Sequence, residues 1–286
     1  MVQLQLHLII YISKTANDII LSQPIKMTGY VRFLNDAVID VKTYDVTLGP
    51  SVLFYTTLGT IQSFSGNRCI HQSLGLTGGK VIQEYSQGNT IVSNLLPIGT
   101  PGTPNRVYSE AIIKFINNNN VFQANAKVSV QAVSGEHPAV ESAGTSLKKY
   151  WKITPQNITE ATEGMSLNFT YEASDVGITS DASYKPLWYY PQYPDVQGFW
   201  RVGPGTFGSE VNPNTRTIVM DGLNSVNGDW TAGEASAAIA TYYSRANGNY
   251  NDPNSWSKTS FNGAAAANAP LKQSDIVLIN SKTITV

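Results

Sequence analysis

The residues with the clearest capacity for chemistry are closely spaced aromatic side chains between positions 188 and 200. Trp188, Tyr189, Tyr190, Tyr193 and Trp200 are interleaved there with prolines. Flat aromatic rings exposed beside Asn and Gln are a common surface for stacking on sugar rings, so these five residues are our candidate glycan-binding site. The alternative is that Trp188 and Trp200 pack in the core of two paired strands, because aromatic residues dominate β cores. We favour the second interpretation.

Paired carboxylates are the next candidates. Glu160 and Glu163 form one pair, and Asp229 and Glu234 form another. Glycosidases use two such groups across a cleft, but 20 acidic residues make chance pairs common, so we interpret these as solvated loop charges. Calcium prefers oxygen ligands, and Asp229, Glu234 and Asp252 could supply them. We therefore predict no catalytic residues, no enzyme activity and no cofactor other than calcium.

Cys69 and His71 are two residues apart, which on a strand places both side chains on one face. A Cys–His dyad could act as a nucleophile, but a lone cysteine is more often a small buried hydrophobe. A single cysteine also excludes an internal disulfide and paired-cysteine zinc sites. The three histidines, His7, His71 and His137, are too widely spaced to predict a shared metal site.

The elements that would position these residues are strands. Short runs of Val, Ile, Thr and Tyr with a period of two recur along the whole chain, separated by Gly, Asn and Pro. Helical periodicity is limited to Glu234–Ala240 and Gly263–Ala269. The run Asn117–Asn120 is predicted to be a hairpin tip, because Asn tolerates left-handed backbone. The chain is predicted to be all-β.

Three regions differ in pattern. Residues 1–92 carry apolar strands at short, regular intervals, which fits either the rungs of a parallel β-helix or a meander. Residues 95–235 have longer strands and wider loops, which is typical of an antiparallel β-sandwich. Residues 241–286 start a further β repeat whose last strand has no polar cap. We expect both ends to be cut from a longer chain and the uncapped rungs to self-associate.

Composition excludes several function classes. Lys and Arg total 19 against 20 acidic residues, so no basic field indicates a nucleic-acid partner. With 42% hydrophobic residues the chain is not predicted to be disordered. No uncharged apolar run is long enough for a membrane-spanning helix. Charged residues are only 14%, and Ser, Thr and Asn are abundant, which suits an extended extracellular protein.

Six segments in order resemble modules of large secreted surface proteins of Bacteroidetes, which commonly leave the cell by the type IX secretion route. They are LLPIGTPGTPNRVYSEAIIKF (Leu95–Phe115), LKKYWKITP (Leu147–Pro155), SLNFTYEASDVG (Ser166–Gly177), GFWRVGPGTFG (Gly198–Gly208), NGDWTAGE (Asn227–Glu234), and Tyr242–Ser257 with Ala269–Val286.

This resemblance implies β-helix-like rungs followed by a β-sandwich and the start of another repeat, and it brings no catalytic residues. We therefore expect an internal, structural or adhesive segment of a secreted cell-surface protein. Its partners would be surface glycans or neighbouring modules of the same chain. The alternatives are a glycan-binding module that uses the 188–200 aromatics and a carbohydrate-active β-helix enzyme.

Overall fold

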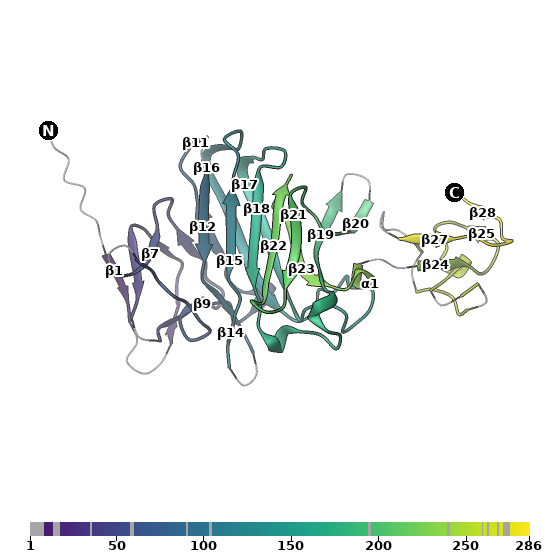
Figure 1. The fold of residues 1–286 in the computed structure, drawn as a ribbon, viewed down its shortest axis with the longest axis horizontal. Coiled ribbons are helices and arrows are strands. Elements are labelled where there is room, and N and C mark those ends of the chain that lie inside the picture. The colour runs from purple at the N-terminus through teal and green to yellow at the C-terminus, as the bar shows by residue number, and fades with distance from the viewer. Residues whose placement is uncertain are drawn as a thin grey trace.

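A computed structural model gives the fold. It describes residues 9–13, 18–34, 36–57, 60–89, 91–102, 105–193, 196–238, 241–258, 260–261, 263–267, 269–270 and 275–286. The described residues are almost entirely strands and turns, and the protein is all-β as predicted. The molecule is elongated, with β1 at one end and β27 and β28 at the other (Figure 1).

The first third of the chain forms three sheets of parallel strands, which we call the parallel stack. On each turn the chain contributes one strand to each sheet, and each strand pairs in parallel with its counterpart on the next turn. A meander would instead pair consecutive strands antiparallel. The three sets are β1 (Ile9–Ile12), β4 (Tyr30–Phe33) and β7 (Leu53–Thr57); β2 (Ile19–Ile20), β5 (Val38–Asp40), β9 (Cys69–His71) and β13 (Ile98–Thr100); and β3 (Ile25–Met27), β6 (Val46–Leu48) and β10 (Val81–Glu84). Two short strands flank these sets, β8 (Thr60–Ile61) beside β7 and β14 (Val107–Tyr108) beside β13.

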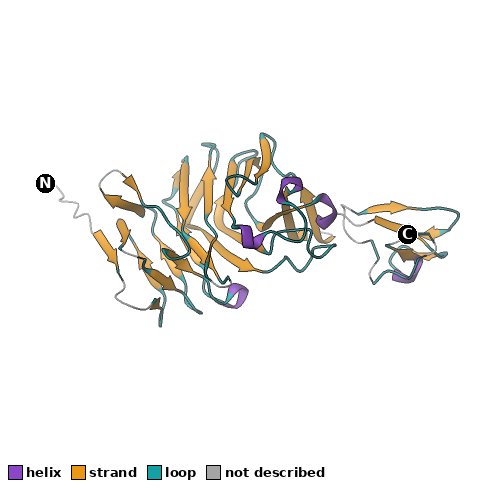
Figure 2. Ribbon diagram, turned by 60° about the horizontal axis from the view of Figure 1, so that its bottom comes forward, coloured by secondary structure: helices purple, strands orange, loops and turns teal. Residues whose placement is uncertain are grey.

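Two antiparallel sheets face each other in the middle of the molecule, as predicted for a sandwich (Figure 2). The first continues the stack sheet that ends in β10, so one sheet changes from parallel to antiparallel pairing between β10 and β16. Its further strands are β16 (Val121–Ser134), which also pairs with β11 (Gly88–Asn89), then β17 (Lys149–Thr159), β23 (Gly228–Gly233), β19 (Lys185–Tyr193) and β20 (Val196–Val202). The opposing sheet contains β12 (Val92–Leu96), β15 (Ala111–Phe115), β18 (Met165–Thr170), β22 (Thr217–Leu223) and β21 (Gly208–Asn212).

The hydrophobic core is continuous from the stack into the sandwich. One cluster of buried side chains extends from Leu21 to Ala232 and spans the predicted boundary at residues 92–95. At the junction the rings of Tyr85, Phe115 and Phe122 contact one another with centroids 4.7–5.3 Å apart. The two predicted regions therefore share the apolar side chains that stabilise them.

The prediction of a hairpin at Asn117–Asn120 is wrong. β15 and β16, on either side of this run, belong to opposite sheets of the sandwich and do not pair with each other. This run instead forms the connection that passes from one sheet to the other, and hydrogen bonds of Asn120 hold it in place. Asn120 is fully buried, its Nδ2 donates to the carbonyls of Asn117 and Gly164, and its Oδ1 accepts from the backbone N–H of Ala161.

The predicted helix at 234–240 is present as α1 (Ala235–Ala238), whereas the described residues of 263–269 are not helical. Residues 241–286 form a small unit with its own core of Tyr242, Trp256 and Ala269. Two of its strand pairs are again parallel: β24 (Thr241–Ser244) with β27 (Ile276–Leu278), and β25 (Gly248–Asn249) with β28 (Ile284–Thr285). The short β26 (Trp256–Ser257) pairs antiparallel with β24.

Candidate functional site

The five predicted glycan-binding aromatics do not share one surface. In the register of the sheet, Trp188 lies opposite Trp230, which lies opposite Trp151. Tyr189 lies opposite Trp200 on the next strand. Because neighbouring residues on a strand point to opposite faces, Trp188 faces the sandwich core and Tyr189 faces the outside of the sheet.

Each tryptophan of the cluster is fixed by packing and by its N–H group. Trp188 is half-buried, stacks on Trp230 at 5.3 Å, and donates from Nε1 to the Asn227 carbonyl at 2.9 Å. Trp200 is only 2% exposed and donates to the Ala139 carbonyl. The prediction of Trp200 as a sugar-stacking surface is therefore wrong, because the segment around Ala139 covers its ring.

The tyrosines of the cluster follow the same division. Tyr190 packs edge-on against Trp188, and its hydroxyl accepts from Nδ2 of Asn227 at 3.3 Å. Tyr189 contacts Trp200. The side chain of Tyr193 lies outside the described residues. No continuous aromatic platform forms from the described members of the cluster, which favours the core interpretation.

A buried His–Asp pair lies over the outer face of this sheet. His137, in the loop after β16, contacts the Asp229 carboxylate with Nε2 and Oδ2 3.0 Å apart, and its Nδ1 accepts from the backbone N–H of Ala139. With Nδ1 as acceptor, Nε2 must carry the proton and donate to Asp229. The rings of Tyr150, Tyr189 and Trp200 surround the imidazole at 4.7–5.0 Å.

This pair holds the loop of residues 135–147 against the outer face of the sheet. His137 is 4% exposed, and the Asp229 Oδ1 atom is buried without a hydrogen-bond partner. Burial raises the pKa values of Tyr150 and Tyr189, and the nearby Asp229 charge raises them further. A buried imidazole with both nitrogens engaged has no free position for a substrate, so the geometry supports a structural role. From the sequence alone, His137 could be assessed only as a possible metal ligand.

The three predicted calcium ligands occupy different environments. Asp229 is bonded to His137. Glu234 accepts from the hydroxyls of Ser183 and Ser236, and Asp252 caps the short helical turn η4 (Pro253–Ser255) in the C-terminal unit. Within the described part of the chain, no group of three or more His, Cys, Asp or Glu side chains is arranged to hold a metal ion.

Cys69 and His71 share a face of β9 as predicted, and Asp40 on β5 lies beside His71 in register. The thiol is sealed, because Sγ lies 3.5 Å from the Gly66 carbonyl and a Cβ on Gly99 would approach Sγ to 2.4 Å. Burial lowers the pKa of His71, and neither ring nitrogen has a hydrogen-bond partner. This arrangement gives Cys69 no space for the approach of a substrate.

Asp40 is the charged member of this group. Its Oδ2 lies 3.9 Å from His71 Nδ1, too far for a hydrogen bond. Burial opposes its ionisation, but hydrogen bonds from Lys42 and Ser73 outweigh burial and lower the pKa of Asp40. His71 also lines a cleft of about 310 Å³ with Asn67, Asn105 and Arg106.

The predicted carboxylate pair, Glu160 and Glu163, lies in a turn that hydrogen bonds hold against residues 224–226. The Glu160 carboxylate accepts from Ser225 Oγ at 2.6 Å and from the Val226 N–H at 2.9 Å, and burial raises the pKa of Glu160. Glu163 has a left-handed backbone, and its N–H donates to Asn224. Both residues thus hold residues 160–163 against 224–226, and their contacts do not define a cleft between two carboxylates.

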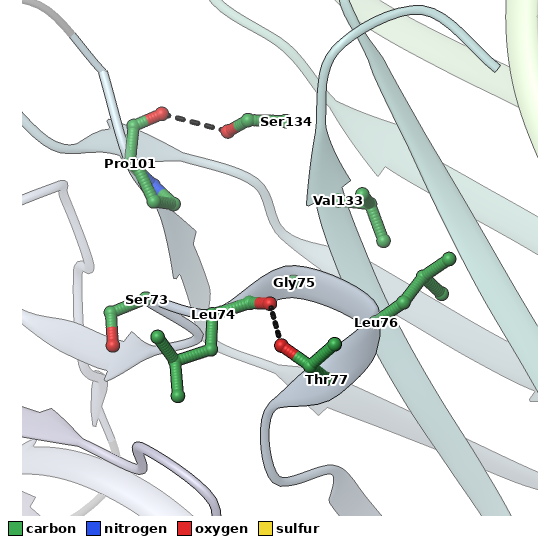
Figure 3. A pocket seen from close by; sticks show the side chains of 8 residues that line it. All are labelled: Ser73, Leu74, Gly75, Leu76, Thr77, Pro101, Val133 and Ser134. Carbon is green, nitrogen blue, oxygen red and sulfur yellow. Dashed lines mark hydrogen bonds between the residues drawn. The ribbon is translucent and has the colours of Figure 1, made fainter. Parts of the chain in front are cut away.

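One surface hollow among the described residues has a volume of about 380 Å³ (Figure 3). Leu74 and Leu76, which lie just before and within the helical turn η1 (Gly75–Thr77), line it together with Pro101 and Val133. The two leucines are 43% and 49% exposed. The lining has no titratable side chain, so the hollow offers apolar contact and no acid–base chemistry.

A buried ion pair at one end of the sandwich was not predicted from the sequence. Lys149 at the start of β17 is 0% exposed, and its Nζ lies 2.6 Å from Oδ2 of Asp175. Asp175 closes the helical turn η2 (Ala173–Asp175) after β18. The only sequence signal is a lysine two positions before the buried Trp151 on the same face of the strand.

Comparisons with known proteins place no family name on this arrangement. A scan against protein-family models, a search of curated proteins and a search of solved structures each found no match. Among the described residues, no helix is long and apolar enough to cross a membrane.

Proposed function

We propose that the chain is a structural segment of a long secreted cell-surface protein, in which a β-helix ends in a β-sandwich and a second β-helix begins beyond it. Such a segment spaces and presents neighbouring modules, which carry any adhesive contacts. The observation that carries the proposal is the core shared between the parallel stack and the sandwich. A shared core makes the two regions a single stiff body, because neither can tilt without separating buried side chains.

The far end of the chain gives independent support. The pairs β24–β27 and β25–β28 repeat the parallel pairing of strands from successive turns that characterises residues 9–100. The order of the segments that resemble Bacteroidetes surface proteins follows the same sequence of stack, sandwich and renewed stack. Low charge and abundant Ser, Thr and Asn suit an extracellular location.

The buried catalytic candidates agree with a structural role. His137, Asp229 and Cys69 each lie below 10% exposure, and their contacts hold strands and loops together. The proposal therefore assigns no turnover to the chain.

Stiffness can be measured directly by the distance between two spin labels. Labels are placed on cysteines introduced at Ile20, which is 62% exposed in the stack, and at the exposed Asn214 in the sandwich. The native Cys69 is buried and leaves the labelling specific. We expect one narrow distance distribution, as narrow as that of a control pair at Asn118 and Asn214 within the sandwich. A broad or two-peaked distribution for the first pair alone would show a hinge and overturn the proposal.

A further inference from the structure

The ion pair between Lys149 and Asp175 has the placement needed for a covalent bond. Lys149 lies on the same face of β17 as Trp151 and Ile153, which belong to the core between the two sheets. Its side chain is therefore enclosed by the sandwich, and it is fully buried. Asp175 is 5% exposed. Water has little access to either group.

The carboxyl group of Asp175 is held in position on several sides. Its Oδ2 accepts from Lys149 Nζ at 2.6 Å and from the backbone N–H of Glu172 at 2.8 Å. The Asp175 carbonyl accepts from the Lys148 N–H at 2.6 Å. Because Cγ is bonded to Oδ2, the lysine nitrogen is within van der Waals reach of Cγ. Groups fixed at such a separation react with effective concentrations of about 10⁵ M or more.

We propose that Lys149 and Asp175 condense to an amide, which covalently joins β17 to the turn after β18. The ammonium group passes one proton to the carboxylate, which leaves a neutral amine beside a neutral acid. The amine nitrogen then bonds to Cγ, the second proton moves to a carboxyl oxygen, and the C–O bond breaks with release of one water. All atoms are supplied by the two side chains, and the product is a neutral amide.

Two features of the site favour this direction. Burial lowers the pKa of Lys149, against the opposing effect of Asp175, and so favours the unprotonated, nucleophilic amine. The N–H of Glu172 polarises the carboxyl group that the amine attacks. A dry site also disfavours the reverse hydrolysis, since water must enter for the amide to break.

The mass of the denatured, intact chain tests the proposal. Amide formation removes one water, about 18 Da, and the single cysteine rules out a mass change from an internal disulfide. The matched control is Lys149→Arg, which keeps the ion pair but has no unprotonated form to act as a nucleophile. We expect the native chain to be lighter by one water, the variant to have its full sequence mass, and a digest to contain a branched peptide joining residues 149 and 175.

Two results would overturn the proposal. A native chain at its full sequence mass after a day at 37 °C shows that Lys149 and Asp175 form an ion pair only. A loss of water in both the native chain and Lys149→Arg shows cyclisation elsewhere, for example at the Asp221–Gly222 sequence. If the variant fails to fold, the digest of the native chain decides the question, because a lighter chain without a branched peptide joining residues 149 and 175 also overturns the proposal.

Discussion

The three rings at the junction of stack and sandwich test whether these regions form one cooperative unit. Phe115 on β15 is 0% exposed and contacts Tyr85 at 5.3 Å and Phe122 at 5.0 Å, both edge-on. Tyr85 follows β10, the stack strand that pairs with the sandwich, and Phe122 lies on the first long strand of the sandwich. Replacing Phe115 by Ala removes the ring that packs edge-on against both of them.

The expected cost can be derived from the structure. Truncation of a fully buried Phe to Ala costs about 3–5 kcal/mol. Two edge-on ring contacts, each worth about 0.5–1.5 kcal/mol beyond buried area, place Phe115 at the upper end of that range, about 5 kcal/mol. A tenfold change in equilibrium corresponds to about 1.4 kcal/mol, so the fraction of unfolded molecules should rise by between three and four orders of magnitude.

Native-state hydrogen exchange read by mass spectrometry measures this effect region by region. If the core is shared, peptides from β6 in the stack and from β18 in the sandwich should lose protection together and by a similar factor in Phe115→Ala. The matched control is Phe207→Ala, the same chemical change at a side chain that is 66% exposed, which should cost less than about 0.5 kcal/mol. Native protection of β6 peptides alongside lost protection in β18 would refute the single-unit interpretation.

Three further predictions follow from buried contacts. Trp188→Ala should cost about 3 kcal/mol in urea unfolding, because it removes the stack on Trp230; lost glycan binding with unchanged stability would instead show a sugar site. Gln72→Leu should cost about 3 kcal/mol, because it removes the side-chain partner of the Gly79 and Val130 carbonyls and of the Ala132 N–H. In His71→Phe, the melting temperature should depend less on pH between pH 7.5 and 5 than it does in the native chain. In the native chain the pKa of His71 is lowered by burial, so the unfolded state takes up more protons than the native state as pH falls below 6.5, and stability declines.

The local sequence pattern was sufficient to predict where strands form, but it was insufficient to predict which strands pair with one another. A period of two predicts a strand and the face of each residue, which is why Cys69 and His71 are correctly placed together. The same rule separates Trp188 from Tyr189, because adjacent residues on one strand face opposite ways. These aromatic residues were grouped as one candidate site because they are close in sequence, whereas the alternation of side chains along β19 places them on opposite faces of the sheet.

The error at Asn117–Asn120 has a related cause. Turn-forming residues between two apolar strands predict a reversal of direction, but they do not determine whether the second strand returns to the same sheet. Here the burial of Asn120, with hydrogen bonds to both sides of the crossing, replaces the backbone pairing that a hairpin would supply.

The contacts that carry the structural argument join residues far apart in sequence. His137 and Asp229 are separated by 92 positions, and Lys149 and Asp175 by 26. Each pair requires two strands or loops to be placed by the whole fold, and no local spacing connects its two members. An unaligned sequence contains no signal that links them.

The low charge of the chain has a consequence inside the parallel stack. Four buried glutamines lie in the stack or face it from β16: Gln62, Gln72, Gln83 and Gln131. Gln62 and Gln83 bond to backbone groups of a neighbouring turn, at Phe33 and Gly49. Gln72 and Gln131 instead link the stack to β16; Gln131, for example, donates towards the carbonyls of residues 75, 76 and 78.

Tight turns between parallel strands leave carbonyls that no ladder pairs, and a buried carbonyl needs a donor. A neutral amide offers two donors and an acceptor without the desolvation cost of a charge, whereas a buried lysine needs a carboxylate beside it. Uncharged glutamine side chains therefore connect successive turns of the stack and join the stack to β16 in a protein with only 14% charged residues.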